Sequence, residues 1–283
     1  MITPFVSRER IPLSGTFKQK ILDVNGNEFL WDIQIKKKIG EGRPLVCVPI
    51  MVSDSKQIIK EAATLVAQGA EMIEWRVDAF SEASSMNSIR CVLEGLEPIT
   101  KDTILVYTYR SKAQGGLGEH PAEMIRDIHQ VAAETKVPDF IDVEYFAEEK
   151  AEKEIRSLQK LGCHVIASHH DFEETPERKV IRMLLELMRN SGASIVKLAV
   201  MPQNMKDVLH LLEETNRFHT ENPNVPVITM SMGALGTISR VAGEYVGSCV
   251  TFGAGELASA PGQLPKNELL TILESLHNCL SAQ

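Results

Sequence analysis

A single lysine in an apolar segment is the first residue of this sequence whose type and position could do chemistry. The segment 194–204 is rich in β-branched and other apolar residues, carries Lys197 near its centre and is stopped by Pro202. Such a short run is typical of a strand buried on both faces. A buried ammonium is costly unless it is paired or neutral, and a neutral lysine amine can form a Schiff base with a carbonyl. The alternatives are a lysine that reaches past the strand end into solvent and one held in a structural ion pair.

A second set of charged residues alternates along the apolar segment 73–78. Strand alternation places Glu74, Arg76 and Asp78 on one face and the apolar residues on the other. Three charges on an inward face are costly unless they pair with one another or bind a ligand. The alternative is therefore a purely structural Glu–Arg pair.

Further polar side chains mark the ends of the next three apolar segments. Arg110 ends the first of them, Asp142 and Glu144 alternate with apolar residues in the second, and His169 and His170 end the third. Adjacent strand residues point to opposite faces, so the two histidines are not expected to share a metal. One histidine at a strand end can act as an acid–base catalyst, since its unperturbed pKa lies near neutral pH, and we favour His170 in this role.

The last part of the chain adds an arginine and a loop of small residues. Arg240 follows a Gly-Thr-Ile-Ser run, and the loop 258–263 contains Ser259 and Gln263. Such loops at the mouth of a barrel are candidate lids, although many are ordinary connections. Gathered near Lys197, Arg76, Arg110 and Arg240 would favour a small anion with a carboxylate and help to keep the lysine unprotonated.

Eight short apolar segments alternate with helical patterns from residue 45 onward. Strand–helix alternation favours a parallel sheet, and eight repeats predict an α/β fold, a (β/α)₈ TIM barrel, whose sites lie at the carboxyl ends of the strands. No GxGxxG or GxxxxGK[ST] motif follows the first segment, which argues against a nucleotide-binding sheet. Thr175 is expected to be the N-cap of one helix. The expected strands are 45–50, 72–77, 103–109, 140–145, 163–168, 194–200, 225–231 and 248–252, and the expected helices are 55–68, 121–135, 148–161, 175–188, 206–217 and 266–280.

The first 44 residues differ from the rest. Two apolar runs flank Asn25-Gly26, a pair that accepts the positive φ of a type I′ turn, so a β-hairpin is expected there. A lysine cluster and two glycines follow and indicate a solvated linker. We therefore interpret residues 1–283 as a single domain, with an N-terminal β-hairpin extension and linker (1–44) and a (β/α)₈ barrel (45–283).

Composition argues against several classes of partner. The chain has 30 basic and 38 acidic residues and a formal net charge of −8, which argues against nucleic acid or an anionic membrane as the main partner. No apolar run has the length of a membrane span, and the first residues lack the pattern of a signal peptide. The five cysteines are widely spaced and lack zinc-type spacing. We therefore expect no metal site and a cytoplasmic location.

Seven segments together resemble type I 3-dehydroquinate dehydratases of the shikimate pathway. They occur in the order found in that family and extend from about residue 45 to the end of the chain. No single segment is decisive, but seven segments in the family's order argue against a chance resemblance. The segments are Glu-Trp-Arg-Val-Asp (74–78), Thr-Tyr-Arg-Ser (108–111), Ser-His-His-Asp-Phe (168–172), Lys-Leu-Ala-Val-Met-Pro (197–202), Thr-Met-Ser-Met (229–232), Ile-Ser-Arg (238–240) and Ala-Ser-Ala-Pro-Gly-Gln (258–263).

The resemblance implies a fold and a reaction. The family is a (β/α)₈ barrel, usually a homodimer, with an N-terminal hairpin near the bottom of the barrel. Lys197 is similar to the lysine that forms a Schiff base with the ketone of 3-dehydroquinate. His170 is similar to the general base that takes the C2 proton and then acts as the acid for loss of the C1 hydroxyl. This syn elimination gives 3-dehydroshikimate for aromatic amino acid (chorismate) biosynthesis and needs no cofactor or metal, because the iminium is the electron sink.

The resemblance also implies how the small anionic substrate is held. Arg240 would bind its carboxylate, and Ser259 and Gln263 would close over it. Three further residues would contact hydroxyls or tune the charge around the imine: Glu74, Arg76 and Arg110. The residues leave open whether the chain serves biosynthesis or quinate breakdown.

One position departs from the family pattern. The family commonly carries a glutamate four residues after Arg110, hydrogen-bonded to the catalytic histidine, and this chain has Gln114. An amide can orient an imidazole but cannot stabilise an imidazolium by charge. We therefore hypothesise a slower or pH-shifted enzyme, or a substitute carboxylate such as Asp142 or Glu144.

Two other interpretations remain. Another lysine-imine barrel, such as an aldolase, would share Lys197 but would not be expected to combine His170 with the 258–263 loop. The second is a protein that is not an enzyme: a catalytically silent barrel that binds an anionic ligand or a partner. The intact Lys197, His170 and Arg240 argue against it, and only Gln114 favours it.

Overall fold

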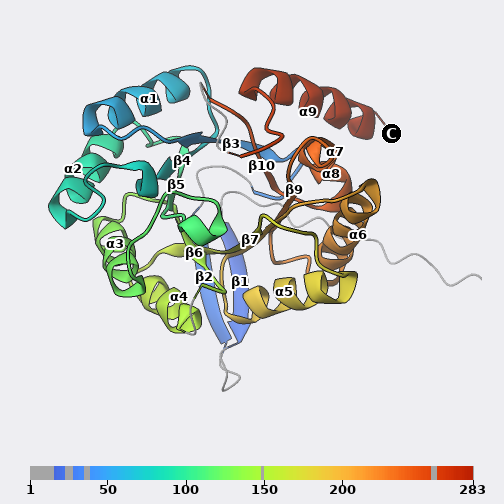
Figure 1. Ribbon diagram of the computed structural model, residues 1–283, viewed down its shortest axis with the longest axis horizontal. Coiled ribbons are helices and arrows are strands. Elements are labelled where there is room, and N and C mark those ends of the chain that lie inside the picture. The colour runs from blue at the N-terminus through green and yellow to red at the C-terminus, as the bar shows by residue number, and fades with distance from the viewer. Residues whose placement is uncertain (1–15, 23–27, 35–38, 148–149, 256–259, 283) are drawn as a thin grey trace, which may run out of the picture.

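Eight parallel strands form the centre of the computed structural model, which describes residues 16–22, 28–34, 39–147, 150–255 and 260–282 (Figure 1). The strand order is β10-β3-β4-β5-β6-β7-β8-β9, and the Cys249 amide donates to the Val227 carbonyl at 2.9 Å across the remaining gap. The predicted (β/α)₈ TIM barrel is therefore confirmed. The strands are β3 (Leu45–Ile50), β4 (Met72–Arg76), β5 (Ile104–Thr108), β6 (Phe140–Glu144), β7 (His164–Asp171), β8 (Ile195–Val200), β9 (Val227–Ser231) and β10 (Val250–Phe252).

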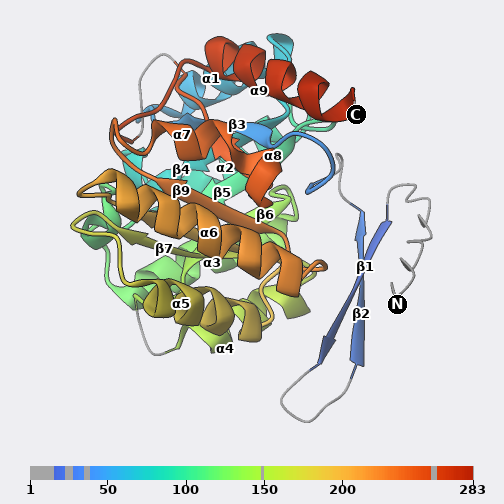
Figure 2. The same cartoon turned by 90° about the vertical axis from the view of Figure 1, so that its right-hand side faces the viewer.

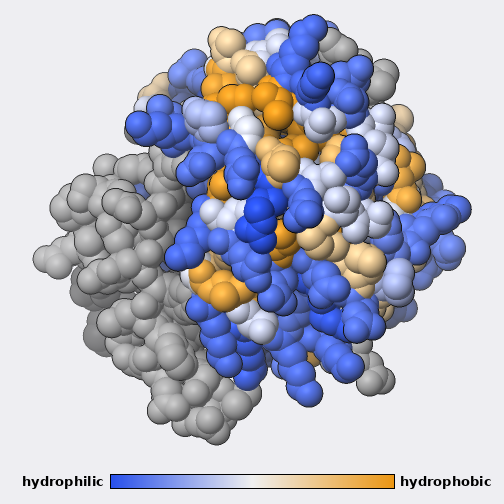
Figure 3. Space-filling view, turned by 90° about the vertical axis from the view of Figure 1, so that its left-hand side faces the viewer, coloured by the Kyte–Doolittle hydropathy of each residue, from blue (hydrophilic) through white to orange (hydrophobic). Residues whose placement is uncertain are grey.

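The helices surround the strands as an outer ring (Figure 1). Side chains cap the amino-terminal ends of three of them: Asp54 at α1, Ser85 at α2, and Asn204, which forms a capping box with Asp207, at α6. Figure 3 shows that one outer face is mostly hydrophilic, as expected of helices that bury only one side. The α-helices are α1 (Ser55–Ala67), α2 (Met86–Leu96), α3 (Ala122–Thr135), α4 (Ala151–Lys160), α5 (Arg178–Asn190), α6 (Met205–Glu221), α7 (Thr237–Val241), α8 (Gly243–Val246) and α9 (Lys266–Ser281), and the short 3₁₀ turns are η1 (Val77–Ala79) and η2 (Lys112–Gln114).

The local predictions differ from the structure at several places. Helices α2, α7 and α8 were not expected, and β7 runs three residues further than predicted, so that it includes both His169 and His170. Thr175 is not an N-cap, because α5 begins at Arg178 with Glu177 in the cap position. The physical reason lies just upstream. The Asp171 carboxylate accepts hydrogen bonds from the backbone amides of Glu173 and Glu174. The Glu174 carbonyl accepts the Met201 amide, so the loop is held against the end of β8 before the helix starts.

Apolar side chains close the amino-terminal end of the barrel interior. Leu45, Met72, Ile104 and Phe140 each stand at the start of a strand, and Ile39, 2 % exposed, packs against them as the chain enters the barrel. A second and larger apolar layer lies between the strands and the helices. The inward polar residues are therefore confined to the other end of the same strands.

The N-terminal segment forms the expected pair of antiparallel strands. Strand β1 (Thr16–Leu22) pairs with β2 (Glu28–Gln34), and Figure 2 shows this ribbon at the side of the barrel. The predicted Asn25-Gly26 turn lies outside the described residues. The division of the chain into one domain with an N-terminal extension stays a prediction. In the part of the chain that the structure describes, no helix has the length and apolar character needed to cross a membrane.

Candidate active site

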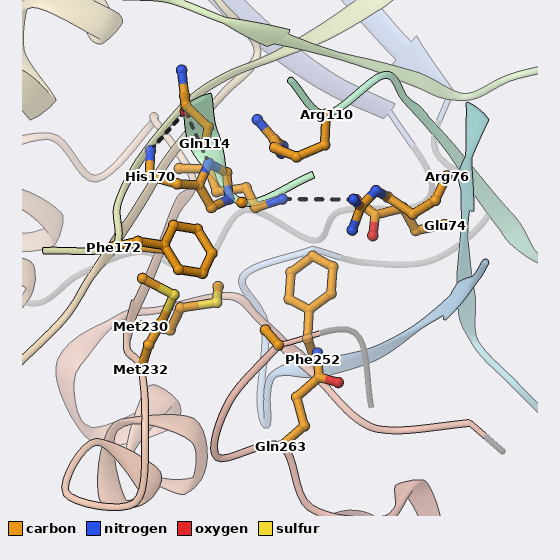
Figure 4. Close-up of a pocket in the computed structure, with 14 residues that line it drawn as sticks. Glu74, Arg76, Arg110, Gln114, His170, Phe172, Met230, Met232, Phe252 and Gln263 are labelled. Carbon is orange, nitrogen blue, oxygen red and sulfur yellow. Dashed lines mark hydrogen bonds and ion pairs between the residues drawn. The ribbon is translucent and has the colours of Figure 1, made fainter. Parts of the chain in front are cut away.

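A pocket opens at the carboxyl ends of the strands, where the sequence predicted the site. Six of the eight predicted site residues line it, and Figure 4 shows charged side chains on one side and an apolar wall on the other. The six are Glu74, Arg76, Arg110, His170, Lys197 and Gln263. The fold therefore brings together residues that lie up to 189 positions apart in the sequence, from Glu74 to Gln263.

Lys197 extends from the middle of β8 to the floor of this pocket. The side chain is buried, and Nζ lies 3.2 Å from Asp142 Oδ2 and 3.8 Å from Glu74 Oε1. The ring of Phe252 covers the same nitrogen, with its centroid 4.6 Å away. Lys197 does not reach past the strand end into solvent. It is an ion-paired lysine whose nitrogen also faces a pocket.

Asp142 is the carboxylate shared by three polar side chains at this end of the barrel. Its carboxylate is fully buried and accepts hydrogen bonds from Arg110 Nη2 at 2.9 Å and Ser168 Oγ at 2.5 Å, besides that from Lys197. Burial opposes ionisation of this carboxyl, but the charges of Arg110 and Lys197 and the hydrogen bonds prevail and lower the pKa of Asp142 to about 2. Asp142 is therefore ionised at neutral pH.

Arg110 has two carboxylate partners. Besides Asp142 it donates from Nη1 to Glu144 Oε1 at 3.0 Å, and although burial works in the other direction, these carboxylates raise its pKa above the usual value. The guanidinium is thus fixed in place as a permanent cation on the pocket wall.

Arg76 is held by Asp78 rather than by Glu74. The guanidinium forms a bidentate pair with the Asp78 carboxylate at 2.8 and 2.7 Å, just past the end of β4. Glu74 instead accepts from the Thr108 hydroxyl at 2.8 Å and faces Lys197. The structural Glu74–Arg76 pair considered from the sequence is therefore wrong, because Arg76 pairs with Asp78 and Glu74 pairs with Lys197.

His170 lies next to the last residue of β7 and is a neutral base. Burial, together with the positive charges of Arg110, Lys197 and Arg76, holds the pKa of His170 well below its usual range. Gln114 Oε1 accepts the His170 amide at 2.8 Å and lies 3.2 Å from Nδ1. That contact assigns the ring proton to Nδ1 and leaves the lone pair on Nε2.

Glycines allow Gln114 to reach the histidine. Gly115 has φ +78° at the end of η2, and a Cβ there would overlap the ring of Phe172, while a Cβ on Gly116 would overlap the Arg110 carbonyl. Asp142 and Glu144, proposed as substitute carboxylates, are engaged by Arg110. The amide of Gln114 is therefore the acceptor that the structure places against His170.

His169 points to the opposite face, as strand alternation predicts. Its ring makes an edge contact with Phe146, with centroids 5.1 Å apart, and burial lowers its pKa. Among the described residues no cluster of His, Cys, Asp and Glu side chains has the arrangement of a metal site.

Arg240 and the 258–263 loop are placed only in part. Arg240 lies on α7, is 1 % exposed and does not itself line the pocket. It donates from Nη2 to the Pro261 carbonyl at 2.9 Å and approaches Met230 Sδ at 3.9 Å. Burial lowers its pKa to about 10, and within the described residues its Nε has no partner. Ser259 lies outside the described residues.

The apolar wall was missed in the sequence. It is formed by Phe172, Met230, Met232 and Phe252, which lie opposite the charged side chains in Figure 4. The spacing of the two methionines at the end of β9 was a usable signal, because residues i and i+2 of a strand share a face. Phe252 had no such signal, since it reads as an ordinary core residue.

The fold and the site together define a class, a (β/α)₈-barrel protein with a buried amine and a neutral imidazole at the mouth of the barrel. The sequence model of the type I 3-dehydroquinase family matches residues 46–279 of this chain. The chain belongs to this family.

Individual relatives agree with that assignment. A 3-dehydroquinate dehydratase of Clostridioides difficile is 41 % identical over 251 residues, covering 88 % of this chain and 98 % of the relative, and one of Bacillus subtilis is 40 % identical over 240 residues, covering 84 % and 94 %. The crystal structure of the type I 3-dehydroquinate dehydratase from C. difficile, with covalently modified comenic acid, superposes with a TM-score of 0.82 at 41 % identity, over 87 % of this chain and 97 % of that one. The similarity thus covers nearly the whole length of each relative.

Proposed function

We propose that this protein is a hydro-lyase that converts 3-dehydroquinate to 3-dehydroshikimate and water. The family, and relatives about 40 % identical that carry this activity in their names, support the reaction. The observation that carries the mechanism is the position of Lys197, a buried amine between two carboxylates on the floor of the pocket that His170 also lines.

In the proposed mechanism the Lys197 amine replaces the oxygen of the substrate ketone. Nζ forms a bond to the carbonyl carbon, one water leaves, and the resulting iminium withdraws electrons from the adjacent C2. His170 Nε2 takes a proton from C2, and the electron pair moves into the iminium to give an enamine. The enamine then expels the C1 hydroxyl, which takes the proton from His170 and leaves as water. A second water hydrolyses the iminium and frees the lysine.

The charge of the pocket suits a carboxylate-bearing substrate. Arg76 and Arg110 contribute fixed cations that can face substrate hydroxyls. Gln263 and Ser259 belong to the loop that would cover the substrate, and of these two Gln263 is described and lines the pocket. Arg240 has no carboxylate partner among the described residues, which leaves it available for the substrate carboxylate.

Reduction with sodium borohydride tests this proposal. Borohydride converts an iminium to a stable secondary amine, so protein incubated with 3-dehydroquinate should gain, at Lys197, the mass of the bound ketone less one oxygen atom, because one water is lost and two hydrogens are added. Ultraviolet absorbance of the conjugated enone should appear in a parallel sample without reductant. Folded protein that gives neither adduct nor enone would favour a silent anion-binding barrel, whereas an adduct with aldol cleavage and no enone would favour an aldolase.

The homodimer, the cytoplasmic location and the biosynthetic role are part of the same proposal. The dimer is supported by family resemblance and by three exposed apolar side chains in one stripe of α5, Val180, Met183 and Leu187. Mass measurement in solution, repeated on Met183→Glu, tests whether this face holds two copies together.

A further inference from the structure

The proton on Lys197 must go somewhere before the amine can attack a ketone. The nitrogen is buried, and its neighbours stabilise the ammonium: two carboxylates and the face of an aromatic ring. The ketone would occupy the side of the nitrogen that opens onto the pocket. An acceptor within the protein is therefore required, and the described neighbours of Nζ can be compared for that task.

Asp142 is the nearer carboxylate but a poor acceptor. It already accepts hydrogen bonds from Arg110, Ser168 and Lys197, and its pKa of about 2 means that it holds a proton weakly. A carboxylate engaged in this way orients the ammonium without taking its proton.

Glu74 differs from Asp142 in its partners. Its Oε1 accepts one neutral hydrogen bond, from the Thr108 hydroxyl, and the ion pair that it forms is the one with Lys197. The neighbouring arginines bind other carboxylates: Arg76 binds Asp78 and Arg110 binds Asp142 and Glu144. The distance of 3.8 Å from Oε1 to Nζ is long for proton transfer, but catalytic hydrogen bonds commonly tighten when the substrate binds.

The two sides of the pocket thus carry separate proton acceptors. Figure 4 shows His170 on one side of the pocket and Glu74 on the other. The Lys197 nitrogen forms its ion pair with Glu74 at 3.8 Å. His170, held by Gln114, faces the position where C2 would lie in the proposed reaction. One acceptor can then work on the nitrogen while the other works on the carbon.

We propose that Glu74 is a catalytic residue, the base that deprotonates Lys197 and the acid that later expels water from the carbinolamine. This inference rests on the Schiff-base function proposed above. Glu74 takes one proton from the ammonium, and the Nζ lone pair forms the C–N bond while the carbonyl electron pair moves to oxygen. One of the two remaining N–H protons moves to that oxygen. Glu74 returns its proton to the hydroxyl, water leaves, and the nitrogen lone pair forms the C=N bond.

The rate of imine formation tests this role apart from the elimination. Protein is mixed with 3-dehydroshikimate, the product ketone, which can form an imine without losing a C2 proton, and is quenched with borohydride at increasing times. The Glu74→Gln variant keeps the shape and the acceptor for Thr108 but cannot take a proton, so the adduct should form about 10²-fold more slowly than in the wild type. An equal rate in Glu74→Gln and the wild type would overturn the inference.

A matched control separates proton transfer from loss of charge. Glu144→Gln removes one carboxylate from the same end of the barrel but leaves both neighbours of Nζ in place, and it should slow trapping much less than Glu74→Gln. Equal slowing in both variants would show that only the electrostatic field matters and would overturn the inference.

Chemical rescue gives a second readout, which does not depend on how well one variant folds. Formate added to Glu74→Ala should restore part of the trapping rate by supplying a small carboxylate in the vacated space, and folded Glu74→Ala that trapped slowly without any response to formate would contradict the assignment. A wild-type protein that formed no Lys197 adduct would refute the proposed function itself, which distinguishes the two failures.

Discussion

The two ends of the barrel are made from the same strands, but one end has an apolar interior and the other a charged interior. At the amino-terminal end, Met72, Ile104 and Phe140 fill the interior with apolar atoms that need no partners. At the carboxyl end, two residues further along two of the same strands, Glu74 and Asp142 place charge in the interior. The first end lowers the free energy of the fold through burial, whereas the second holds charges that require mutual pairing to be tolerated. Substitutions at the two ends should therefore change different measured quantities.

The largest expected effect is on catalysis at the charged end. Lys197→Met removes the nucleophile and should lower kcat by about 10⁴-fold or more, with no borohydride adduct. Asp142 keeps its hydrogen bonds from Arg110 and Ser168, so the fold should survive. Steady-state kinetics and thermal unfolding check the two parts. Substantial turnover in this variant would contradict the proposed mechanism.

The next effect is on stability at the apolar end. Phe140→Ala leaves a cavity among the side chains at the start of the strands and should lower the free energy of unfolding by about 3–5 kcal/mol. Below the melting temperature kcat should be unchanged, because the pocket lies at the other end of the barrel. Denaturant unfolding together with kcat measures both, and a large loss of kcat in the folded variant would show that the two ends are coupled.

A third variant tests whether the charged end sacrifices stability for binding. Arg240→Met removes a buried guanidinium that has no carboxylate partner in the described chain, so the melting temperature should hold or rise. If Arg240 binds the substrate carboxylate, KM should increase by about 10- to 100-fold, since a hydrogen bond to a charged group contributes about 1.5–3 kcal/mol. An unchanged KM would remove Arg240 from the substrate site.

The smallest effect concerns the partner of His170. The low pKa of His170 means that its base form is present at neutral pH and is lost only as the pH falls through that low pKa. Gln114→Glu adds a negative charge that should raise the pKa, move the acid limb of kcat to higher pH by about one unit and increase kcat a few-fold. The pH profile of kcat measures this, and identical profiles would refute the idea that Gln114 makes the enzyme slower or pH-shifted.

The pKa of His170 also bears on stability. Because the unfolded chain takes up a proton near pH 6.5 while the folded protein does so only at lower pH, stability is fully present above about pH 6.5 and falls as the pH drops toward the folded pKa. Unfolding measured between neutral and mildly acidic pH should show this loss, and it should be smaller in His170→Asn.

The architecture could be predicted from sequence because each strand is a compact apolar run, and the inward polar residues appeared at the ends of these runs. Partners were harder to predict. Alternation indicated the face of Arg76 but not that it would bind Asp78, since the chain leaves the strand at η1. Similarly, α5 starts late because Asp171 binds the loop before it, a contact that depends on a side chain rather than on helix propensity. The place of Phe252 over Lys197 depends on closure of the barrel, which no local pattern encodes.

The tight seat of Gly115 against Phe172 has a consequence for protein engineering. A randomised library across this loop would lose most of its members wherever position 115 gains a side chain, because the ring leaves no room for a Cβ and the backbone has a positive φ. With that glycine held constant, position 114 can be varied by itself to change the pKa of His170. The acidity of the adjoining imidazole could then be tuned by selection while the backbone that presents it stays where it is.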